Sequence, residues 1–188
     1  GHCLCADVGV WLDHLAVIIC FVLVFPIGVR ESVLEPEITL REDDLNGPEI
    51  KALLEAHLAN AALHSPPESV HALDMAELRA SNITFWTVWQ GEALLACGAL
   101  KELEVGHGEI KSMHTAQSHR GKGIAGKLVA RILQEAERRS YKRLRLETGS
   151  IEAYASARGL YGRFGFLECP PFGEYKPDPH SFFMTRFL

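Results

Sequence analysis

The sequence feature that most constrains this chain is a basic, glycine-rich turn at residues 117–126, which runs directly into a helical pattern at residues 127–139. The start of a helix presents unpaired backbone N–H groups and a partial positive charge, which together favour an anion and especially a phosphate. Glycines in the turn let a ligand approach the backbone closely, and Arg120 and Lys122 add charge-assisted contacts. The turn therefore predicts a ligand that contains phosphate.

The charge of the chain narrows the class of that ligand. The net charge is −5 and charged residues make up 23% of the 188 residues, so we expect no nucleic-acid partner. The basic residues concentrate between Lys111 and Arg145, a local positive field in an acidic protein. This distribution favours a small anionic ligand over a polymer.

The cysteines indicate a reducing compartment. There are five, an odd number, and their spacing contains no zinc-binding pattern beyond a lone Cys3-x-Cys5. We therefore expect free thiols, a cytoplasmic protein and no metal site.

The first 35 residues differ in pattern from the rest. Residues 15–29 form an uncharged apolar run, which is shorter than the ~20 residues of a membrane helix and is interrupted by Pro26 and Gly28. We expect residues 1–35 to be an apolar extension that packs on the domain or on a second subunit of a homodimer. A membrane anchor and upstream sequence outside the functional protein are the less favoured alternatives. Residues 36–188 are expected to form a single domain.

The hydrophobic pattern after Pro36 predicts an α/β domain of mixed order. Alternating or aromatic-rich runs predict strands at residues 38–41, 83–89, 93–103, 109–115, 143–147, 166–169 and 181–188. Apolar stripes at helical spacing predict helices at residues 48–61, 73–78, 127–139 and 153–164. Turns are expected at residues 90–92 and 106–108. Several strands come first and a β-α-β-α-β order follows, which implies a mixed sheet with helices on both faces.

The glycine turn matches the dinucleotide fingerprint G-x-G-x-x-G at Gly121, Gly123 and Gly126. Glu147 lies about 20 residues further on, where a ribose ligand would be expected. A Rossmann unit usually opens its domain, however, and too little chain follows Gly126 for a doubly wound sheet. A dinucleotide-binding oxidoreductase is therefore a weak alternative.

The same turn also matches the phosphate-loop pattern G-x-x-x-x-G-K at residues 121–127. That loop needs Ser or Thr after its lysine to hold magnesium, whereas this chain has Leu128. No apolar strand ending in Asp follows to supply a second magnesium ligand. The phosphate-loop interpretation is therefore weak as well.

A third motif fits the context of the turn. Arg120-x-x-Gly123-x-Ala125 has the form R-x-x-G-x-G/A, follows a strand and opens a helix. Residues 157–166 have the form A-x-x-L-Y-x-x-x-G-F. With these two motifs in this order, the chain resembles the GNAT superfamily of N-acetyltransferases over residues 37–188. Residues 109–113, 146–149 and 171–185 resemble a bacterial branch of small acetyltransferases known mostly by fold.

The resemblance implies a fold and a reaction. The fold would be a mostly antiparallel sheet of about six to seven strands with one parallel, splayed pair and helices on both faces. The reaction would be direct attack of a primary amine on the thioester of acetyl-CoA in a ternary complex, without a metal. The residues implied to bind acetyl-CoA are Met113, His114, Thr115, Arg120, Gly121, Lys122, Gly123, Ile124, Ala125 and Gly126. The strand residues would pair with pantetheine amides, and the turn would hold the pyrophosphate.

The resemblance also implies two proton transfers. Tyr161 lies where the family places the general acid that protonates the leaving thiolate, and a phenol with a pKa near ~10 can donate. Tyr154 replaces an asparagine that often contacts the cofactor. A base must deprotonate the amine, and Glu109, Glu147 and His114 are the candidates. His114 could titrate near neutral pH, and its alternative is a histidine in solvent at the end of a strand. The carboxylates have ion pairing as an alternative role, which for Glu109 would involve Lys111.

The acceptor is expected between the hairpin at residues 85–89, the early helices and the loop at residues 175–181. We expect Trp86, Tyr175 and Asp178 to contact it. The acidic side chains of Glu174 and Asp178 would favour a cationic acceptor such as a small polyamine, an amino acid or an aminoglycoside-like amine. The non-enzymatic alternative is an acyl-CoA-binding sensor or partner domain that has lost turnover.

Overall fold

A computed structural model of the chain describes residues 36–188. The expected apolar extension, residues 1–35, lies outside the described residues. Within the described part every predicted strand and helix is present, and its ends lie within a few residues of their expected positions. No helix among residues 36–188 is long and apolar enough to cross a membrane.

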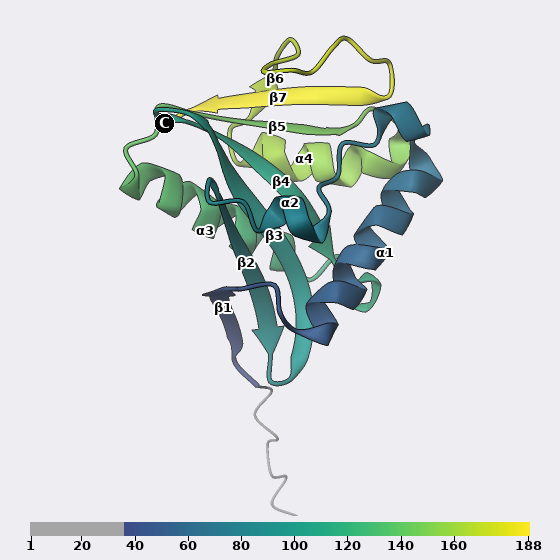
Figure 1. The fold of residues 1–188 in the computed structure, drawn as a ribbon, viewed down its shortest axis with the longest axis vertical. Coiled ribbons are helices and arrows are strands. Elements are labelled where there is room, and N and C mark those ends of the chain that lie inside the picture. Colours follow the sequence, from purple (N-terminus) through teal and green to yellow (C-terminus); the bar gives the residue numbers. More distant parts are fainter. Residues whose placement is uncertain (1–35) are drawn as a thin grey trace, which may run out of the picture. The chain divides into compact units, whose positions relative to one another are not determined.

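Seven strands form one mixed sheet in the order β1-β2-β3-β4-β5-β7-β6 (Figure 1). β4 and β5 pair in parallel, and every other neighbouring pair is antiparallel. The strands are β1 (Ile38–Glu42), β2 (Ile83–Gln90), β3 (Ala93–Glu104), β4 (His107–Thr115), β5 (Arg143–Gly149), β6 (Leu167–Glu168) and β7 (Ser181–Phe187). The expected sheet, mostly antiparallel with one parallel pair, is confirmed.

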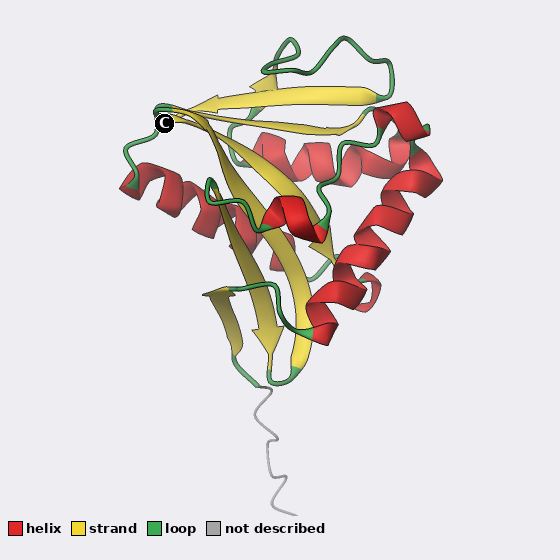
Figure 2. Ribbon diagram, viewed as in Figure 1, coloured by secondary structure: helices red, strands yellow, loops and turns green. Residues whose placement is uncertain are grey.

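Helices cover both faces of the sheet, as the sequence predicts (Figure 2). They are α1 (Pro48–His64), α2 (Met75–Leu78), α3 (Ile124–Arg138) and α4 (Ala155–Arg163), with 3₁₀ turns at Pro67–Ser69, Gln117–His119 and Glu152–Tyr154. On the face of α1 and α2, Leu54 and Leu78 form a core cluster with Phe85 of β2. On the face of α3 and α4, Leu128 and Tyr161 belong to a larger cluster.

The turn before β4 is shorter than expected. Gly106 makes the turn with φ +79°, but β4 already begins at His107. Gly108 therefore lies within the strand, where a Cβ would overlap the side chains of Tyr141 and Leu144. This glycine allows close packing and does not make the turn, which the local sequence alone does not reveal.

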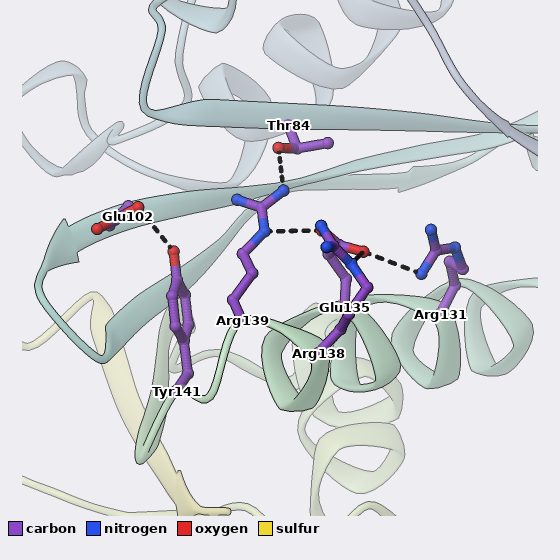
Figure 3. A network of polar contacts seen from close by, with 7 residues as sticks. All are labelled: Thr84, Glu102, Arg131, Glu135, Arg138, Arg139 and Tyr141. Carbon is purple, nitrogen blue, oxygen red and sulfur yellow. Dashed lines mark hydrogen bonds and ion pairs between the residues drawn. The ribbon is translucent and has the colours of Figure 1, made fainter.

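A polar network fastens α3 to the sheet (Figure 3). Glu135 is 1% exposed and forms ion pairs with three arginines, which are Arg131, Arg138 and Arg139. Arg139 donates from Nε to Glu135 at 2.7 Å and from Nη2 to Thr84 of β2 at 2.6 Å. The network therefore links the C-terminal half of α3 to β2 through polar contacts in addition to the apolar core.

Candidate active site

β4 and β5 separate part of the way along their length (Figure 1). Their parallel pairing ends at Ile110 and Leu146, although both strands continue. Just beyond this point β4 carries a β-bulge, since its register with β3 shifts and Ser112 adopts φ +52°. A bulge bends and twists a strand, so it turns the end of β4 away from β5. From Ser112 to Thr115, β4 therefore has no strand partner on its β5 side among the described residues.

A cavity of about 640 Å³ lies beside this open strand edge. Its walls come from the end of β4, the glycine turn, the first turn of α3, and α4. It brings together nine of the ten residues that were expected to bind acetyl-CoA, namely Met113, His114, Thr115, Arg120, Gly121, Gly123, Ile124, Ala125 and Gly126. The tenth, Lys122, is exposed at the tip of the turn and is not among the lining residues.

The glycine turn has the geometry that a phosphate requires. Gly121 and Gly123 have φ +76° and +77°, a conformation that other residues rarely adopt. Gly123 is the N-cap of α3 and no side chain caps this helix, so the first backbone N–H groups remain available to a ligand. Arg120 donates from Nε to the carbonyl oxygen of Thr115 at 3.2 Å, which holds the guanidinium against the end of β4. These residues fit the pyrophosphate of acetyl-CoA.

Tyr161 projects from α4 toward the gap between the strands. It is 6% exposed, packs edge-on against Phe166 at 5.9 Å between ring centroids, and lines both the 640 Å³ cavity and an adjoining one of about 130 Å³. Its hydroxyl forms no hydrogen bond with another residue of the described part. Burial, with a smaller contribution from the charge of Glu147, raises the pKa of Tyr161 well above its ordinary value. The phenol is therefore protonated throughout the neutral range and can donate.

Tyr154 contributes an aromatic wall to the same two cavities. Its ring packs on Gly149 at the end of β5, where any Cβ would overlap it. Arg158 of α4 fixes the loop between them, since its Nη1 donates to the carbonyl oxygens of Gly149 at 2.7 Å and of Ile151 at 2.8 Å. Tyr154 thus fills the position that often holds an asparagine in the family. Its ring can pack there only because residue 149 is a glycine.

Glu147 lines the 130 Å³ cavity together with Tyr161. One of its oxygens accepts a hydrogen bond from the Ser181 hydroxyl at 2.8 Å, and no residue among 36–188 forms an ion pair with it. Burial raises the pKa of Glu147, although the Ser181 hydrogen bond opposes the shift. A carboxylate with a raised pKa and an open oxygen is suited to accept a proton.

Glu109 lies in a buried cluster with different partners. It is 2% exposed, accepts a hydrogen bond from the Tyr175 hydroxyl at 2.6 Å, and pairs with Lys111 at 3.4 Å. Lys111 in turn donates to Tyr175 at 2.6 Å and to the carbonyl oxygen of His71 at 2.9 Å. The ion pair that was the alternative role for Glu109 is present. The cluster ties β4 to the loops that carry His71 and Tyr175.

His114 differs from both expectations for it, because it neither stands in solvent nor titrates near neutral pH. It is half-buried on β4 and packs against His57 of α1, with 5.3 Å between ring centroids. Burial is the main cause that lowers the pKa of each ring to about 4. Sequence reasoning missed His57, although its position seven residues after Ile50 places it on the buried stripe of α1.

A larger cavity of about 1190 Å³ lies under the loop before β7. Glu109, Lys111, Arg145, Tyr175 and Asp178 all line it, so two of the three expected acceptor contacts lie here. The Asp178 carboxylate also accepts a hydrogen bond from the backbone N–H of His180 at 2.8 Å. Hydrogen bonding from Ser69 and His180 holds the pKa of Asp178 below its ordinary value.

The expectation that Trp86 contacts the acceptor is wrong. Trp86 is 0% exposed and belongs to the core cluster under α3, where Arg131 lies 5.5 Å from its ring centroid. Its neighbour Phe85 belongs to the core cluster under α1 and α2. β2 is covered by helices on both faces, so Trp86 and Phe85 pack into two different cores and not into a pocket.

Two further lining residues were not predicted. Ser112 borders the 130 Å³ cavity, and its hydroxyl is buried without a hydrogen-bond partner. Arg145 lies two residues before Glu147 on β5, and this spacing, which places both on one face of a strand, was the signal that could have found it. Among residues 36–188, no group of three or more His, Cys, Asp and Glu side chains is placed to hold a metal ion.

Comparison with known proteins agrees with this geometry. The model of the acetyltransferase (GNAT) family matches residues 50–166. The chain is 51% identical over 149 residues to the uncharacterized N-acetyltransferase YsnE of Bacillus subtilis, which covers 79% of this chain and 99% of YsnE. It is 45% identical over 150 residues to the uncharacterized N-acetyltransferase YedL of Escherichia coli, which covers 80% of this chain and 94% of YedL.

Solved structures show the same fold. A protein of Klebsiella pneumoniae that was assigned as an acyl-CoA N-acyltransferase has a TM-score of 0.67 and 30% identity, over 80% of this chain and 97% of its own. A GNAT-family acetyltransferase of Elizabethkingia anophelis, solved with acetyl-CoA bound, has a TM-score of 0.59 and 18% identity, over 80% of this chain and 98% of its own. The chain belongs to the GNAT family of acetyl-CoA-dependent acetyltransferases.

Proposed function

We propose that this enzyme transfers the acetyl group of acetyl-CoA directly to a primary amine of a small molecule, with both substrates bound at once. One observation carries the proposal. Where β4 and β5 separate, a protonated phenol, Tyr161, and a half-buried carboxylate, Glu147, line one cavity. Direct transfer needs one group that gives a proton to the leaving sulfur and one that takes a proton from the amine.

The acetyl donor would lie along the open edge of β4. The backbone groups of residues 113–115 that lack a strand partner would pair with the pantetheine amides. The backbone N–H groups at the start of α3 and the guanidinium of Arg120 would hold the pyrophosphate. Lys122, at the exposed tip of the turn, would add only to the local positive field. In this arrangement the thioester would lie beside Tyr161.

Tyr161 is proposed to protonate the sulfur as the bond to the acetyl group breaks. Its raised pKa keeps the proton on the phenol until the thiolate develops, so the donor is present at any neutral pH. Its hydroxyl has no competing partner in the described part of the chain, and its position on α4 is fixed by core packing against Phe166.

Glu147 is proposed as the base in preference to Glu109 and His114. Glu109 already accepts a hydrogen bond from Tyr175 and pairs with Lys111, and it is not among the residues that line the 130 Å³ cavity of Tyr161. His114, with a pKa of about 4, is a weak base. Glu147 combines a raised pKa with a place in the cavity of Tyr161. The acceptor would enter through the 1190 Å³ cavity, past Tyr175 and Asp178.

The test measures release of free thiol from acetyl-CoA with a panel of primary amines. We expect turnover with at least one amine and a fall in kcat of about 10²-fold in Glu147→Gln. The matched control is Glu109→Gln, which should lose stability but change kcat less than tenfold. A larger kcat loss in Glu109→Gln would move the base to Glu109.

Thermal melting with added cofactors separates the enzyme from its alternatives. Acetyl-CoA should raise the melting temperature, because a ligand that binds only the native state stabilises it. Stabilisation without thiol release for any amine would favour the non-catalytic sensor. Stabilisation by NADH but not by acetyl-CoA would contradict the proposed donor.

A further inference from the structure

Arg145 lies on the floor of the acceptor cavity. It occupies the middle of β5, where Leu144 and Leu146 point into the core under α3 and α4. Since side chains alternate along a strand, Arg145 points to the opposite face, the same face as Glu147. It is half-buried and lines the 1190 Å³ cavity.

The guanidinium of Arg145 contacts an aromatic ring but has no polar partner among residues 36–188. Its Cζ lies 5.4 Å from the ring centroid of Phe172, and it forms no hydrogen bond or ion pair with any residue in the described part of the chain. Two neighbouring cations are engaged, in contrast to Arg145. Arg143 donates to the Thr185 hydroxyl at 3.1 Å, and Lys111 has three polar partners.

An unpaired guanidinium in a cavity indicates an anionic ligand group. Arginine presents five N–H donors in a planar fork that matches a carboxylate or a phosphate in two parallel hydrogen bonds. The aromatic contact with Phe172 orients the fork before a ligand arrives, which lowers the entropic cost of binding. Acidic side chains such as Glu174 and Asp178 also line this cavity and disfavour a highly charged phosphate.

The distance from Arg145 to Glu147 sets the size of the ligand. Two residues along a strand span roughly 6.6 Å. The 1190 Å³ cavity and the 130 Å³ cavity share lining from Lys111 and residues 69–72, so they adjoin. A small molecule can therefore present an amine to Glu147 and an anionic group to Arg145 only if the two groups are a few bonds apart.

We propose that the acceptor carries a carboxylate close to its amine, as an amino acid does, and that Arg145 binds this carboxylate. The inference rests on the proposed function, since it assigns the substrate class of the same site. It excludes polyamines and aminoglycoside-like amines, which would place a second cation beside the guanidinium. The acidic residues of the cavity attract the ammonium group, and Arg145 fixes the opposite end.

The test uses pairs of acceptors that differ only in the carboxylate. Lysine is compared with 1,5-diaminopentane, and phenylalanine with 2-phenylethylamine, by calorimetric titration into the protein saturated with CoA. The wild type should bind the amino acid of at least one pair ten or more times tighter than its amine. Arg145→Ala should abolish the preference, and Arg145→Lys should restore only part of it because the bidentate fork is lost.

Arg143→Ala is the matched control, since Arg143 lies on the same strand face but has its own partner. It should keep the preference of the wild type. Equal or tighter binding of the amines without a carboxylate, or the same loss in Arg143→Ala, would overturn the assignment, as would the absence of binding by any amino acid. Melting temperatures of the two alanine variants verify that both are folded.

Different results would contradict the carboxylate site and the proposed acetyl transfer. Thiol release with any amine supports acetyl transfer whether or not a carboxylate is preferred. Binding of amino acids that depends on Arg145, without thiol release, would support the carboxylate site and contradict acetyl transfer.

Discussion

The pKa values of two carboxylates of this protein, the buried Glu135 and the half-buried Glu147, are shifted in opposite directions. Glu135 on α3 is 1% exposed and pairs with three arginines (Figure 3), and the hydrogen bonds and charges of two of them, Arg138 first and then Arg139, lower its pKa to about 2. Glu147 on β5 receives one hydrogen bond from a neutral hydroxyl, and burial raises its pKa. Burial alone therefore does not decide what a carboxylate does. The direction of its pKa shift depends on how many cationic hydrogen-bond donors surround it.

Glu135 belongs to a structural region, the arginine network of α3, whereas Glu147 belongs to the proposed reactive region around Tyr161. The Glu135 oxygens accept hydrogen bonds from Arg131, Arg138 and Arg139, so no acceptor capacity is left for a substrate. Glu147 shares a cavity with Tyr161, so it retains room and affinity for a proton. Substitutions in the first region should change stability, and those in the second should change turnover.

The largest effect is expected for Glu135→Ala. Removing one member of a buried ion-pair network leaves the remaining charges uncompensated and costs about 3 to 5 kcal/mol of unfolding free energy. Urea denaturation measures this loss, and kcat should be unchanged where the protein is folded. Glu137→Ala, an exposed position on the same helix, is the control and should lie within about 0.5 kcal/mol of the wild type. A loss of kcat at unchanged stability would place Glu135 in the reactive region.

Tyr161→Phe should show the reverse behaviour. Loss of the proton donor should lower kcat by about 10²-fold while the affinity for acetyl-CoA and the melting temperature change little. Tyr141→Phe is the control, because Tyr141 lines neither of the two cavities that Tyr161 lines and its hydroxyl donates to Glu102 at 3.1 Å. Steady-state kinetics measures both variants. Equal kcat in Tyr161→Phe and the wild type would mean that another group protonates the sulfur.

The pH dependence of stability should distinguish the histidine pair from Glu135. His57 and His114 have pKa values of about 4 in the folded protein and about 6.5 when unfolded, so the unfolded state binds more protons as the pH falls from 6.5 toward 4. We expect a loss of about 2 to 3 kcal/mol between pH 7 and pH 5, to which the less buried His114 contributes less than His57. The stabilisation from Glu135, whose pKa falls from 4.5 to about 2, is lost only below pH 4.5.

Urea denaturation at pH 7 and pH 5 measures this loss. The double variant His57→Gln, His114→Gln should flatten the dependence above pH 5, whereas Glu135→Gln should not. A dependence that persists in the double variant would exclude the histidine pair as its main source.

The smallest effect is expected at the glycine turn. Gly123→Ala places a Cβ at φ +77°, which costs about 1 kcal/mol, although no atom lies within 4 Å of that Cβ. The KM for acetyl-CoA should rise about fivefold with little change in kcat. Gly162→Ala, on α4 with equal space, is the control and should be neutral or stabilising. A fall in kcat larger than the rise in KM would mean that the turn acts in chemistry as well as in binding.

Local patterns in the sequence predicted most of the fold and the donor site. The R-x-x-G-x-G/A spacing requires a turn followed by a helix, and the structure places Gly123 as the N-cap of α3 in the left-handed conformation. The α3 stripe and the hairpin of β2 and β3 likewise follow from neighbouring residues. The catalytic roles, the cytoplasmic location and the homodimer remain predictions.

Non-local packing accounts for what the sequence did not predict. The alternating side-chain pattern of β2 does not reveal whether a strand face meets a pocket or a helix. The sequence therefore predicted an acceptor contact for Trp86, which lies in the core. His114 was expected to titrate near neutral pH, because burial against His57 of α1 is invisible in the chain. The ion pair of Glu109 with Lys111 depends on the loop that delivers Tyr175, 66 residues away along the chain.

The sequence by itself determined the glycine turn, the order of the elements and the positions of Tyr161 and Glu147, because backbone conformation and side-chain periodicity act over a few residues. Only the tertiary structure decided that Glu109 is ion-paired, that Glu147 shares a cavity with Tyr161, and that Arg145 has no polar partner among the described residues. Those properties depend on the charges and solvent that surround a side chain in three dimensions, and distant segments supply them.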